Sequence, residues 1–260
     1  MIITIPQIQV FFFIIARVAG IFIQAPILSS RSFPTLGKTA LAIWISLILW
    51  FVTPIKIELM PQNLIGFVLA LTTEVMLGFT IGFACNIIFL SIQSAGELID
   101  LQMGLSVAQS FDPVFGGAVS IMGRALFFTG IVIFFAVDGH HLFLSILHQS
   151  FNMIPAPAVI NLASPSFITT LMGLGATLLN LSIKLAIPAI LVIFISDFCF
   201  GIVSRVAPQV NVFMLGFQVK PSLGLLTLFL IMPLLVKQIA SLLGIMGEEA
   251  LKLLLALKIA

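Results

Sequence analysis

The stretch GELIDLQMGLSVAQSFDPVFGG, residues 96–117, is a polar interruption in an otherwise strongly apolar chain. Helical spacing places Gln93, Glu97 and Asp100 four and three residues apart, so that they form a polar stripe on one helix face. A second stripe further along consists of Gln102, Ser106 and Gln109. A helix with these stripes has no face suited to lipid alone, so we expect it to line water or to pack against other polar helices.

The second half of this stretch predicts a helix end followed by a loop. We expect the helix to end at residues 111–113 (Phe-Asp-Pro), because proline disfavours helical geometry at the residue before it. Val114 and Phe115 then lie beside the flexible backbone of Gly116 and Gly117. Such a loop suits a pore constriction, in which apolar bulk excludes water and a flexible base lets the loop move. An ordinary connecting loop with its phenylalanines in a core fits the same residues, and the spacing does not separate the two.

The composition limits what can cover the folded chain. Of its 260 residues, 61% are hydrophobic and only 8% are charged, which is too little polar material to cover a protein surface. We therefore expect lipid, partner subunits or both to cover it. The net charge is only +2, and the basic residues are scattered singly instead of forming the stripe that a phosphate backbone requires. Nucleic acid is not expected as a partner.

The apolar runs predict an all-α fold. Connections rich in glycine, proline and polar residues separate these runs. The first run lacks the basic start and the small-residue cleavage site of a signal peptide, so we expect it to stay as a helix. About six runs approach or exceed the length that crosses a hydrocarbon core of ~30 Å, at residues 5–28, 39–53, 64–92, 121–150, 166–203 and 222–257.

The last two runs are too long for one straight crossing of a bilayer. At 1.5 Å per residue they would reach ~57 Å and ~54 Å. We predict a long helical hairpin joined by residues 205–221, with kinks at Pro188 and Pro233, where proline removes a backbone donor. The distribution of lysine and arginine among the connections places this joining segment on the cytoplasmic side.

The charges inside the apolar runs include Glu74, Lys184 and Asp197. Each costs roughly 2.5–3.5 kcal/mol at a bilayer centre, so we expect these charges to be buried against protein or to face water. For Glu74, a hydrogen bond to a neighbouring helix and a place in a conduction path are both open. Lys184 and Asp197 are ~20 Å apart along a straight helix, too far to pair, so each is expected to find another partner. Arg17 lies near enough to the end of its run to extend its charge to the interface.

The sequence contains few residues in patterns typical of catalysis or metal binding. The cluster that comes nearest to it consists of Asp138, His140, His141 and His148. His141 and His148 are seven residues apart instead of the three or four typical of ligands on one helix, and Asp138 suits a helix N-cap. The two cysteines lie in separate apolar runs, and no GxSxG motif or phosphate-binding loop is present. We predict no catalytic residue, no metal site and no cofactor.

Two short patterns bear on packing and on internal repeats. GFTIG at residues 78–82 is a GxxxG pattern, which in an apolar helix favours a close helix contact. FLSIQS at 89–94 is similar to FLSILHQS at 143–150. An autonomous secondary transporter, the alternative suggested by the charges inside the runs, typically contains inverted repeats, and this similarity is too short to count as one. An intramembrane hydrolase would require a nucleophile and a base that the sequence does not supply.

Four blocks, in one order and over nearly the whole chain, resemble the FliR-type export-gate proteins of flagellar type III secretion, which include the SctT/SpaR subunits of virulence injectisomes. The blocks are RVAGIFIQAPILSSRSFP (17–34), GELIDLQMGLSVAQSFDP (96–113), VDGHHLFLSILHQSFNMIP (137–155) and SDFCFGIVSRVAPQVNVFMLGFQVK (196–220). Within them, DLQMGLS and PQVNVFMLG are closer to the flagellar branch.

The resemblance implies an all-α, membrane-associated subunit of an export gate in the bacterial inner membrane, within the flagellar basal body. Residues 1–165 would be FliP-like and residues 166–260 would form a FliQ-like helical hairpin. With FliP-like and FliQ-like subunits, the chain would form the pore through which unfolded export substrates pass. The energy-transducing components would be partner subunits, so no catalysis is expected of this chain.

The resemblance also assigns roles to residues. A plug loop at 110–120 would close the pore with Phe111, Asp112, Pro113, Val114, Phe115, Gly116 and Gly117. Pore lining or contact between subunits would involve Glu97, Asp100, Gln102 and Gln109. A cytoplasmic connection that FlhB-like and FlhA-like subunits approach would contain Arg205, Pro208, Gln209, Asn211 and Lys220.

Overall fold

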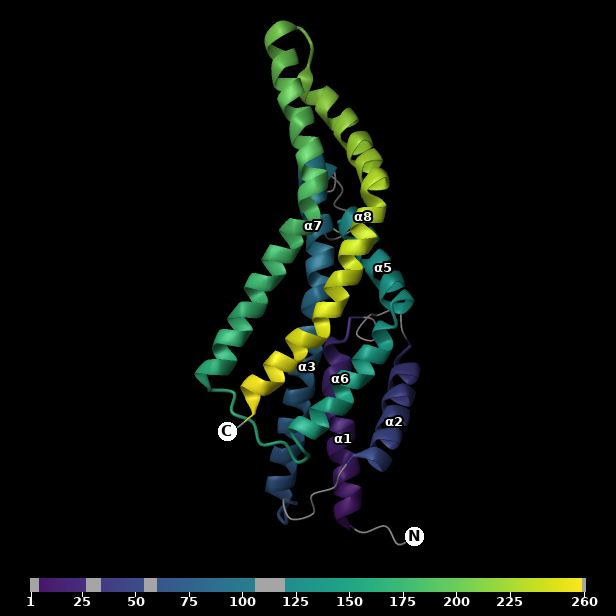
Figure 1. The fold of residues 1–260 in the computed structure, drawn as a ribbon, viewed down its shortest axis with the longest axis vertical. Helices are drawn as coiled ribbons and strands as arrows, with labels where there is room; N and C mark the ends of the chain where they lie inside the picture. The colour runs from purple at the N-terminus through teal and green to yellow at the C-terminus, as the bar shows by residue number, and fades with distance from the viewer. Residues whose placement is uncertain (1–4, 27–33, 54–59, 106–119, 259–260) are drawn as a thin grey trace. The chain divides into compact units, whose positions relative to one another are not determined.

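The computed structural model describes residues 5–26, 34–53, 60–105 and 120–258 (Figure 1). Within these ranges the chain is almost entirely helical, and the extended pairing there is a single bridge between Ile160 and Lys258. The helices are α1 (Ile5–Gln24), α2 (Thr35–Val52), α3 (Leu64–Met103), α5 (Ile121–Ala136), α6 (Gly139–Met153), α7 (Pro165–Val206) and α8 (Val212–Leu257).

Five of these helices are long and apolar enough to cross a membrane, namely α1, α2, α3, α7 and α8. The pair α5 and α6, taken as one broken span, passes the same test and brings the number to six. The predicted all-α fold with about six apolar segments is therefore confirmed for the part of the chain described.

The predicted run 121–150 is two helices instead of one. α5 ends at Ala136, and Asp138 adopts a left-handed conformation with φ 57° before α6 begins at Gly139. A right-handed helix cannot continue through a left-handed residue, which explains the break. Asp138 occupies the N-cap position of α6 as predicted, but its side chain makes no capping hydrogen bond.

The polar stretch 96–117 starts inside α3. This helix runs for 40 residues to Met103 and ends at Gly104, whose φ is 79° and whose N–H donates to the Leu101 carbonyl at 3.2 Å. Glycine takes a left-handed conformation without a steric penalty, so it terminates the helix here. The end of α3 therefore comes before residues 111–113, where the proline predicted it.

The hairpin connection is shorter than predicted. α7 ends at Val206 and α8 begins at Val212, so residues 207–211 join them in place of 205–221. Pro221 lies inside α8, where an interior proline removes one backbone hydrogen bond without ending the helix. Lys220 is consequently a helical residue and does not belong to the connection.

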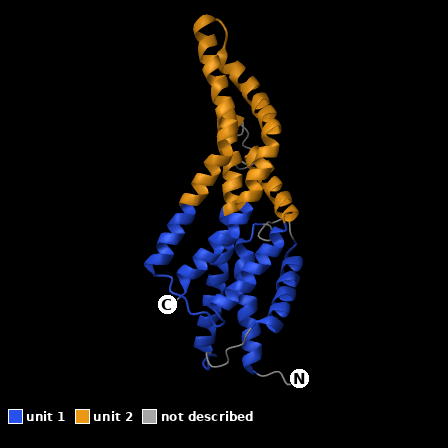
Figure 2. Cartoon of the chain, in the orientation of Figure 1, with its two compact units in different colours: residues 1–87, 138–175, 243–260 blue, residues 88–137, 176–242 orange. Residues whose placement is uncertain are grey.

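The chain folds as two compact units (Figure 2). Unit 1 contains residues 1–87, 138–175 and 243–260, and unit 2 contains residues 88–137 and 176–242. Helices α3, α7 and α8 contribute to both units. These two units are defined by contacts within the folded chain. The division into a FliP-like part (1–165) and a FliQ-like part (166–260), which the resemblance implies, stays a prediction.

Unit 1 is built on a close crossing of α1 and α3. A Cβ atom on Gly78 would clash with the backbone carbonyl of Arg17, and one on Gly82 would lie 2.7 Å from the Ile21 oxygen. Only glycine lets the two backbones approach this closely. The contact predicted from GFTIG is thus present, and α1 is the partner helix.

Unit 2 contains a second close helix crossing of this kind, between α3 and α5. A Cβ atom on Gly96 would lie 2.5 Å from the Cα atom of Gly123. Above this crossing, the Phe89 ring packs against the rings of Phe127 and Phe134, with centroids 6.0 and 5.6 Å apart. In the same unit, α7 and α8 run beside each other as an antiparallel hairpin (Figure 1).

Candidate functional site

The best-defined polar centre of unit 1 is a buried ion pair. Arg17 on α1 and Glu74 on α3 have fully buried side chains, and Arg17 Nε donates to Glu74 Oε2 at 2.7 Å. Arg17 had been expected to reach the interface from the end of its helix. The opposite charge on α3 makes burial possible, because an ion pair can be taken out of water when its partners satisfy both charges.

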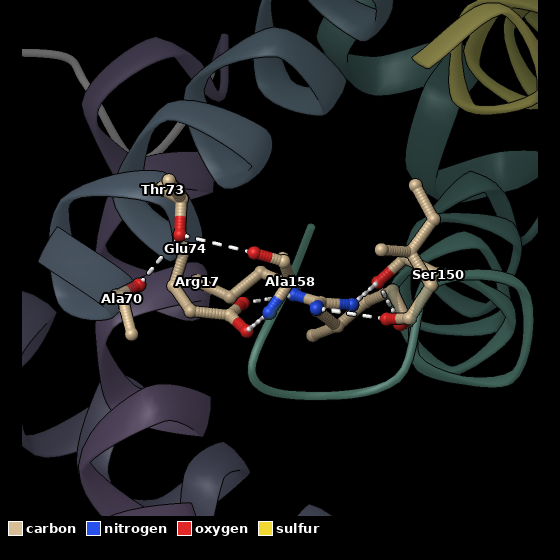
Figure 3. A network of polar contacts seen from close by, with 8 residues as sticks. Arg17, Ala70, Thr73, Glu74, Ser150 and Ala158 are labelled. Atoms are coloured by element: carbon tan, nitrogen blue, oxygen red, sulfur yellow. Dashed lines mark hydrogen bonds and ion pairs between the residues drawn. The ribbon is translucent and has the colours of Figure 1, made fainter. Parts of the chain in front are cut away.

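The surrounding polar groups complete this pair (Figure 3). Arg17 Nη1 donates to Ser150 Oγ at 3.2 Å, and Nη2 donates to the Ile154 carbonyl at 2.9 Å. The Arg17 guanidinium also lies 4.0 Å from the centre of the Phe151 ring. On the other side, the Ala158 N–H donates to Glu74 Oε1 at 2.7 Å.

The Arg17–Glu74 centre therefore joins three helices and a loop. It connects α1, α3 and α6 to residues 154–158, and every one of these parts belongs to unit 1. Both Glu74 oxygens have a donor, and neither charged side chain is exposed to solvent. Of the two roles open for Glu74, this geometry matches the bonding between helices and offers no water contact for conduction.

The second buried carboxylate, Asp100, lies in unit 2 and is 2% exposed. Its Oδ2 atom accepts hydrogen bonds from Ser120 Oγ at 2.6 Å and from the Met122 N–H at 3.1 Å. Ser120 is the N-cap of α5, and its Oγ accepts from the Gly123 N–H at 2.7 Å. Asp100 thus extends the cap of α5 from another helix, and its negative charge suits the positive end of the helix dipole.

Glu97 and Asp100 do not share one environment, although the predicted stripe contains both. Glu97 is exposed and accepts a hydrogen bond from Gln93 Nε2 at 2.9 Å, as the four-residue spacing predicts. Both carboxylates line a hollow of about 460 Å³ in unit 2. Asp100 Oδ1 is buried and finds no hydrogen-bond partner in the described part of the chain.

A second hollow in unit 2, of about 510 Å³, brings together three of the predicted residues. Gln102 of α3, Asp197 of α7 and Lys220 of α8 all line it. Lys220 Nζ and Asp197 Oδ1 form an ion pair at 2.5 Å, with side chains 26% and 32% exposed. Asp197 thus finds its partner on the neighbouring helix of the hairpin, and Lys220, predicted in a loop, is this partner.

The hairpin end exposes the other residues predicted for the connection. Arg205 lies in the last turn of α7, and Pro208 and Gln209 follow in the turn. Asn211 immediately precedes α8, and its Oδ1 accepts from the Met214 N–H at 3.2 Å. All four are exposed on this chain.

Lys184 was expected to be a buried charge, and the structure places it on the exposed side of α7. The buried stripe of this part of α7 consists of Ser182, Leu185, Ala186 and Ala189. Lys184 lies outside this stripe, so α7 packs in unit 2 without taking the charge inside.

The plug residues 111–117 and Gln109 lie outside the described residues, as does the whole segment 106–119. The plug therefore stays a prediction.

The histidine cluster has a geometry that the spacing did not predict. Asp138, His140 and His141 bring ligand atoms within 4.8 Å of one another, whereas His148 Nε2 lies 3.3 Å from Asn152 Nδ2 one turn along α6. The three side chains are exposed or half-exposed, and the predicted absence of a metal site stays a prediction.

Comparison with known proteins gives a consistent result over most of the chain. Residues 8–246 match the family described as "Bacterial export proteins, family 1". The chain is 31% identical to the flagellar biosynthetic protein FliR of Pectobacterium carotovorum over 86% of this chain and 85% of that protein. It is 29% identical to FliR of Escherichia coli K12, over 87% and 85% of the two chains.

A relative from outside the flagellum matches a shorter part of the chain. The secretion system apparatus protein SsaT of Salmonella typhimurium is 32% identical over 62% of each chain. The family match covers more than nine-tenths of the sequence and includes both buried carboxylates of α3. The chain therefore belongs to the family of bacterial export proteins, family 1.

Proposed function

We propose that this chain is a non-catalytic subunit of the flagellar type III protein export gate. It forms, with FliP-like and FliQ-like subunits, the pore through which unfolded substrates pass. Residues 1–165 correspond to a FliP-like part and 166–260 to a FliQ-like hairpin, in the bacterial inner membrane within the basal body. The single observation that carries this proposal is the family match over residues 8–246, since its relatives are named flagellar biosynthetic and secretion apparatus proteins.

The lengths of α7 and α8 support assembly with other proteins. At 1.5 Å per residue their 42 and 46 residues follow paths of ~63 and ~69 Å, about twice the ~30 Å hydrocarbon core of a bilayer. Lipid tails therefore cannot cover the whole of either helix.

The exposed surface of the hairpin is nevertheless apolar. In the most apolar 18-residue window of α7, only 17% of the residues are buried within the chain, against 67% in α3. Large exposed side chains of α7 and α8 include Met172, Phe194, Phe198, Phe213, Phe229 and Leu230. Soluble single chains rarely expose such continuous apolar patches, so partner subunits are the natural cover for the part that extends beyond the lipid.

The exposed end of the hairpin, with Arg205, Pro208, Gln209 and Asn211, suits the cytoplasmic contact with FlhB-like and FlhA-like subunits. Its polar side chains differ from the apolar faces of the helices that it joins. Lys220 is better assigned to the hairpin itself, because it pairs with Asp197.

The assembly is tested by purification of the tagged full chain with and without the other export-apparatus subunits of the same bacterium. We expect the chain alone to aggregate in mild detergent and the co-expressed chain to yield one complex of defined size. An autonomous secondary transporter, the second candidate, would be monodisperse alone and would move a solute in liposomes. Two of the charges that suggested a transporter have partners within the chain, since Glu74 pairs with Arg17 and Asp197 pairs with Lys220.

The plug is tested separately in the assembled gate. Deletion of residues 111–117 is expected to make the reconstituted gate conduct ions, because the deletion removes the apolar bulk that excludes water. Planar-bilayer conductance or growth of cells on salt measures the leak. Gly173→Ala, at a helical position of α7 with nothing within 4 Å of its Cβ position, is the control and is expected to leave the gate tight. A gate that stays as tight as wild type after loss of 111–117 excludes this plug.

A further inference from the structure

The hollow beside Asp100 has an unusual lining for its place in an apolar protein. Helix α3, the N-cap of α5 and helix α7 form its walls, and all three parts belong to unit 2. Two carboxylates line it, Glu97 and Asp100. Three hydroxyl groups line it as well, those of Ser94, Ser120 and Ser182. None of its ten lining residues is basic.

Asp100 is the group that makes the hollow incomplete. Its Oδ2 atom already serves the cap of α5, whereas Oδ1 is buried and has no hydrogen-bond partner among the residues that the structure describes. Buried carboxylates in folded proteins are almost always paired or fully hydrogen-bonded, because the loss of hydration is otherwise uncompensated. The missing partner is therefore a hydrogen-bond donor. A cationic donor would also compensate the negative charge of the carboxylate.

The size and walls of the hollow select among cationic groups. Liquid water occupies about 30 Å³ per molecule, so a bare metal ion with a few waters would fill only a small part of 460 Å³. The rest of the lining is apolar and includes Leu98, Leu101, Leu178, Leu179 and Ile183. Lysine and arginine have long aliphatic side chains that end in a positive charge. The aliphatic part can pack against the apolar walls while the charged end pairs with a carboxylate.

We propose that this hollow receives a lysine or arginine side chain from another subunit of the export apparatus, with its cationic head on the exposed carboxylate of Glu97 and close to the buried negative charge of Asp100. The inference rests on the proposed function, because it requires an assembly. It adds a location and a chemistry for one contact between subunits. It also assigns the two carboxylates to subunit contact in place of pore lining.

The first test compares charge-neutral variants in the co-expressed complex. Asp100→Asn keeps an oxygen for Ser120 and the Met122 N–H but removes the negative charge beside the hollow, so we expect at least a tenfold loss of co-purified subunits. Glu97→Gln, at an exposed position that caps nothing, is expected to give a smaller loss of about threefold. Glu248→Gln removes an exposed carboxylate of unit 1 and is expected to have no effect.

The second test identifies the occupant directly. A photo-activatable cross-linking residue at Leu179, on the wall of the hollow, is expected to give a cross-linked peptide from another subunit, with a lysine or arginine next to the linked position. Exchange of the two charges, Asp100→Lys together with that basic residue changed to aspartate, is expected to restore at least half of the subunit recovery that either change alone abolishes.

The failures of the inference and of the proposed function are distinguishable. If the wild-type chain recovers no apparatus subunit, the proposed function fails. If wild type recovers them and both Asp100→Asn and Glu97→Gln do so equally well, only the inference fails. A cross-link from Leu179 to lipid alone, or to this chain alone, overturns it too.

Discussion

Helix α3 carries one buried carboxylate in each unit, Glu74 in unit 1 and Asp100 in unit 2. Glu74 has donors on both oxygens, and one of them is the guanidinium of Arg17 from the same chain. Among the described residues, Asp100 has donors on one oxygen only, both neutral. The comparison separates a polar centre that the described part of the chain completes from one that this part leaves open.

The difference has a physical meaning because a buried charge without a partner is costly. Unit 1 removes this cost internally and gains a rigid junction of α1, α3 and α6. Unit 2 retains part of the cost in the isolated chain, which is tolerable in a subunit whose final surroundings include other proteins. The predictions below concern the stability that the Arg17–Glu74 pair gives to unit 1 and the contribution of Ser120 and Asp100 to the start of α5.

The largest effect is expected at the closed centre. Glu74→Leu leaves the Arg17 charge buried without its counter-ion, and loss of one member of a buried pair typically costs about 3–5 kcal/mol. We expect the folded fraction of the variant, measured by size-exclusion chromatography of the co-expressed complex after graded heating, to collapse at a much lower temperature than that of wild type.

The control removes both charges. Arg17→Met combined with Glu74→Leu eliminates the uncompensated charge and keeps apolar bulk in the site, so the double variant is expected to regain most of the stability lost by Glu74→Leu. If the double variant is no more stable than the single one, the loss comes from packing and the ion pair is not what completes unit 1.

The α1–α3 crossing beside Glu74 supplies an intermediate effect. Gly78→Ala places a methyl group against the Arg17 carbonyl, which must move, and overpacking of this kind costs about 1–3 kcal/mol. Gly173→Ala on α7 serves as the matched control, because nothing lies within 4 Å of its Cβ position and alanine favours the helix. The same heating assay is expected to show a lower transition for Gly78→Ala and an unchanged or higher one for Gly173→Ala. Equal transitions for both would contradict the close crossing.

The sequence predicted the large features of this fold because they depend on local pattern. Apolar run lengths predict the six segments and the hairpin, and glycine spacing predicts the contact at Gly78. Helical spacing also predicts the Gln93–Glu97 hydrogen bond. Each of these properties arises within one helix or from the length of one run.

The sequence did not predict the pairings between helices. Arg17 and Glu74 are 57 positions apart, and the tight α1–α3 crossing decides that they meet. One signal was present, because Arg17 is the single charge of α1 and Glu74 is the one carboxylate in the most apolar part of α3. Asp100 and Ser120 meet in the same way through the Gly96–Gly123 crossing. The end of α3 at Gly104 was not predicted either, because it depends on a left-handed glycine, and the helix end predicted at residues 111–113 lies outside the described residues.

The smallest effect concerns the internal half of the open centre. Ser120→Ala removes the N-cap of α5 while the Asp100 bond to the Met122 N–H remains, and caps of this kind contribute about 1 kcal/mol. We expect faster hydrogen exchange at the first amides of α5, with unchanged exchange in α1. Ser94→Ala, which removes a hydroxyl from the same hollow without a capping role, is expected to leave α5 as in wild type. Neither variant changes the charge of Asp100, so both are expected to recover partner subunits normally. Equal acceleration by the two variants would contradict a specific capping role of the Ser120 hydroxyl, and the Met122 N–H would then be the internal donor through which Asp100 holds the start of α5.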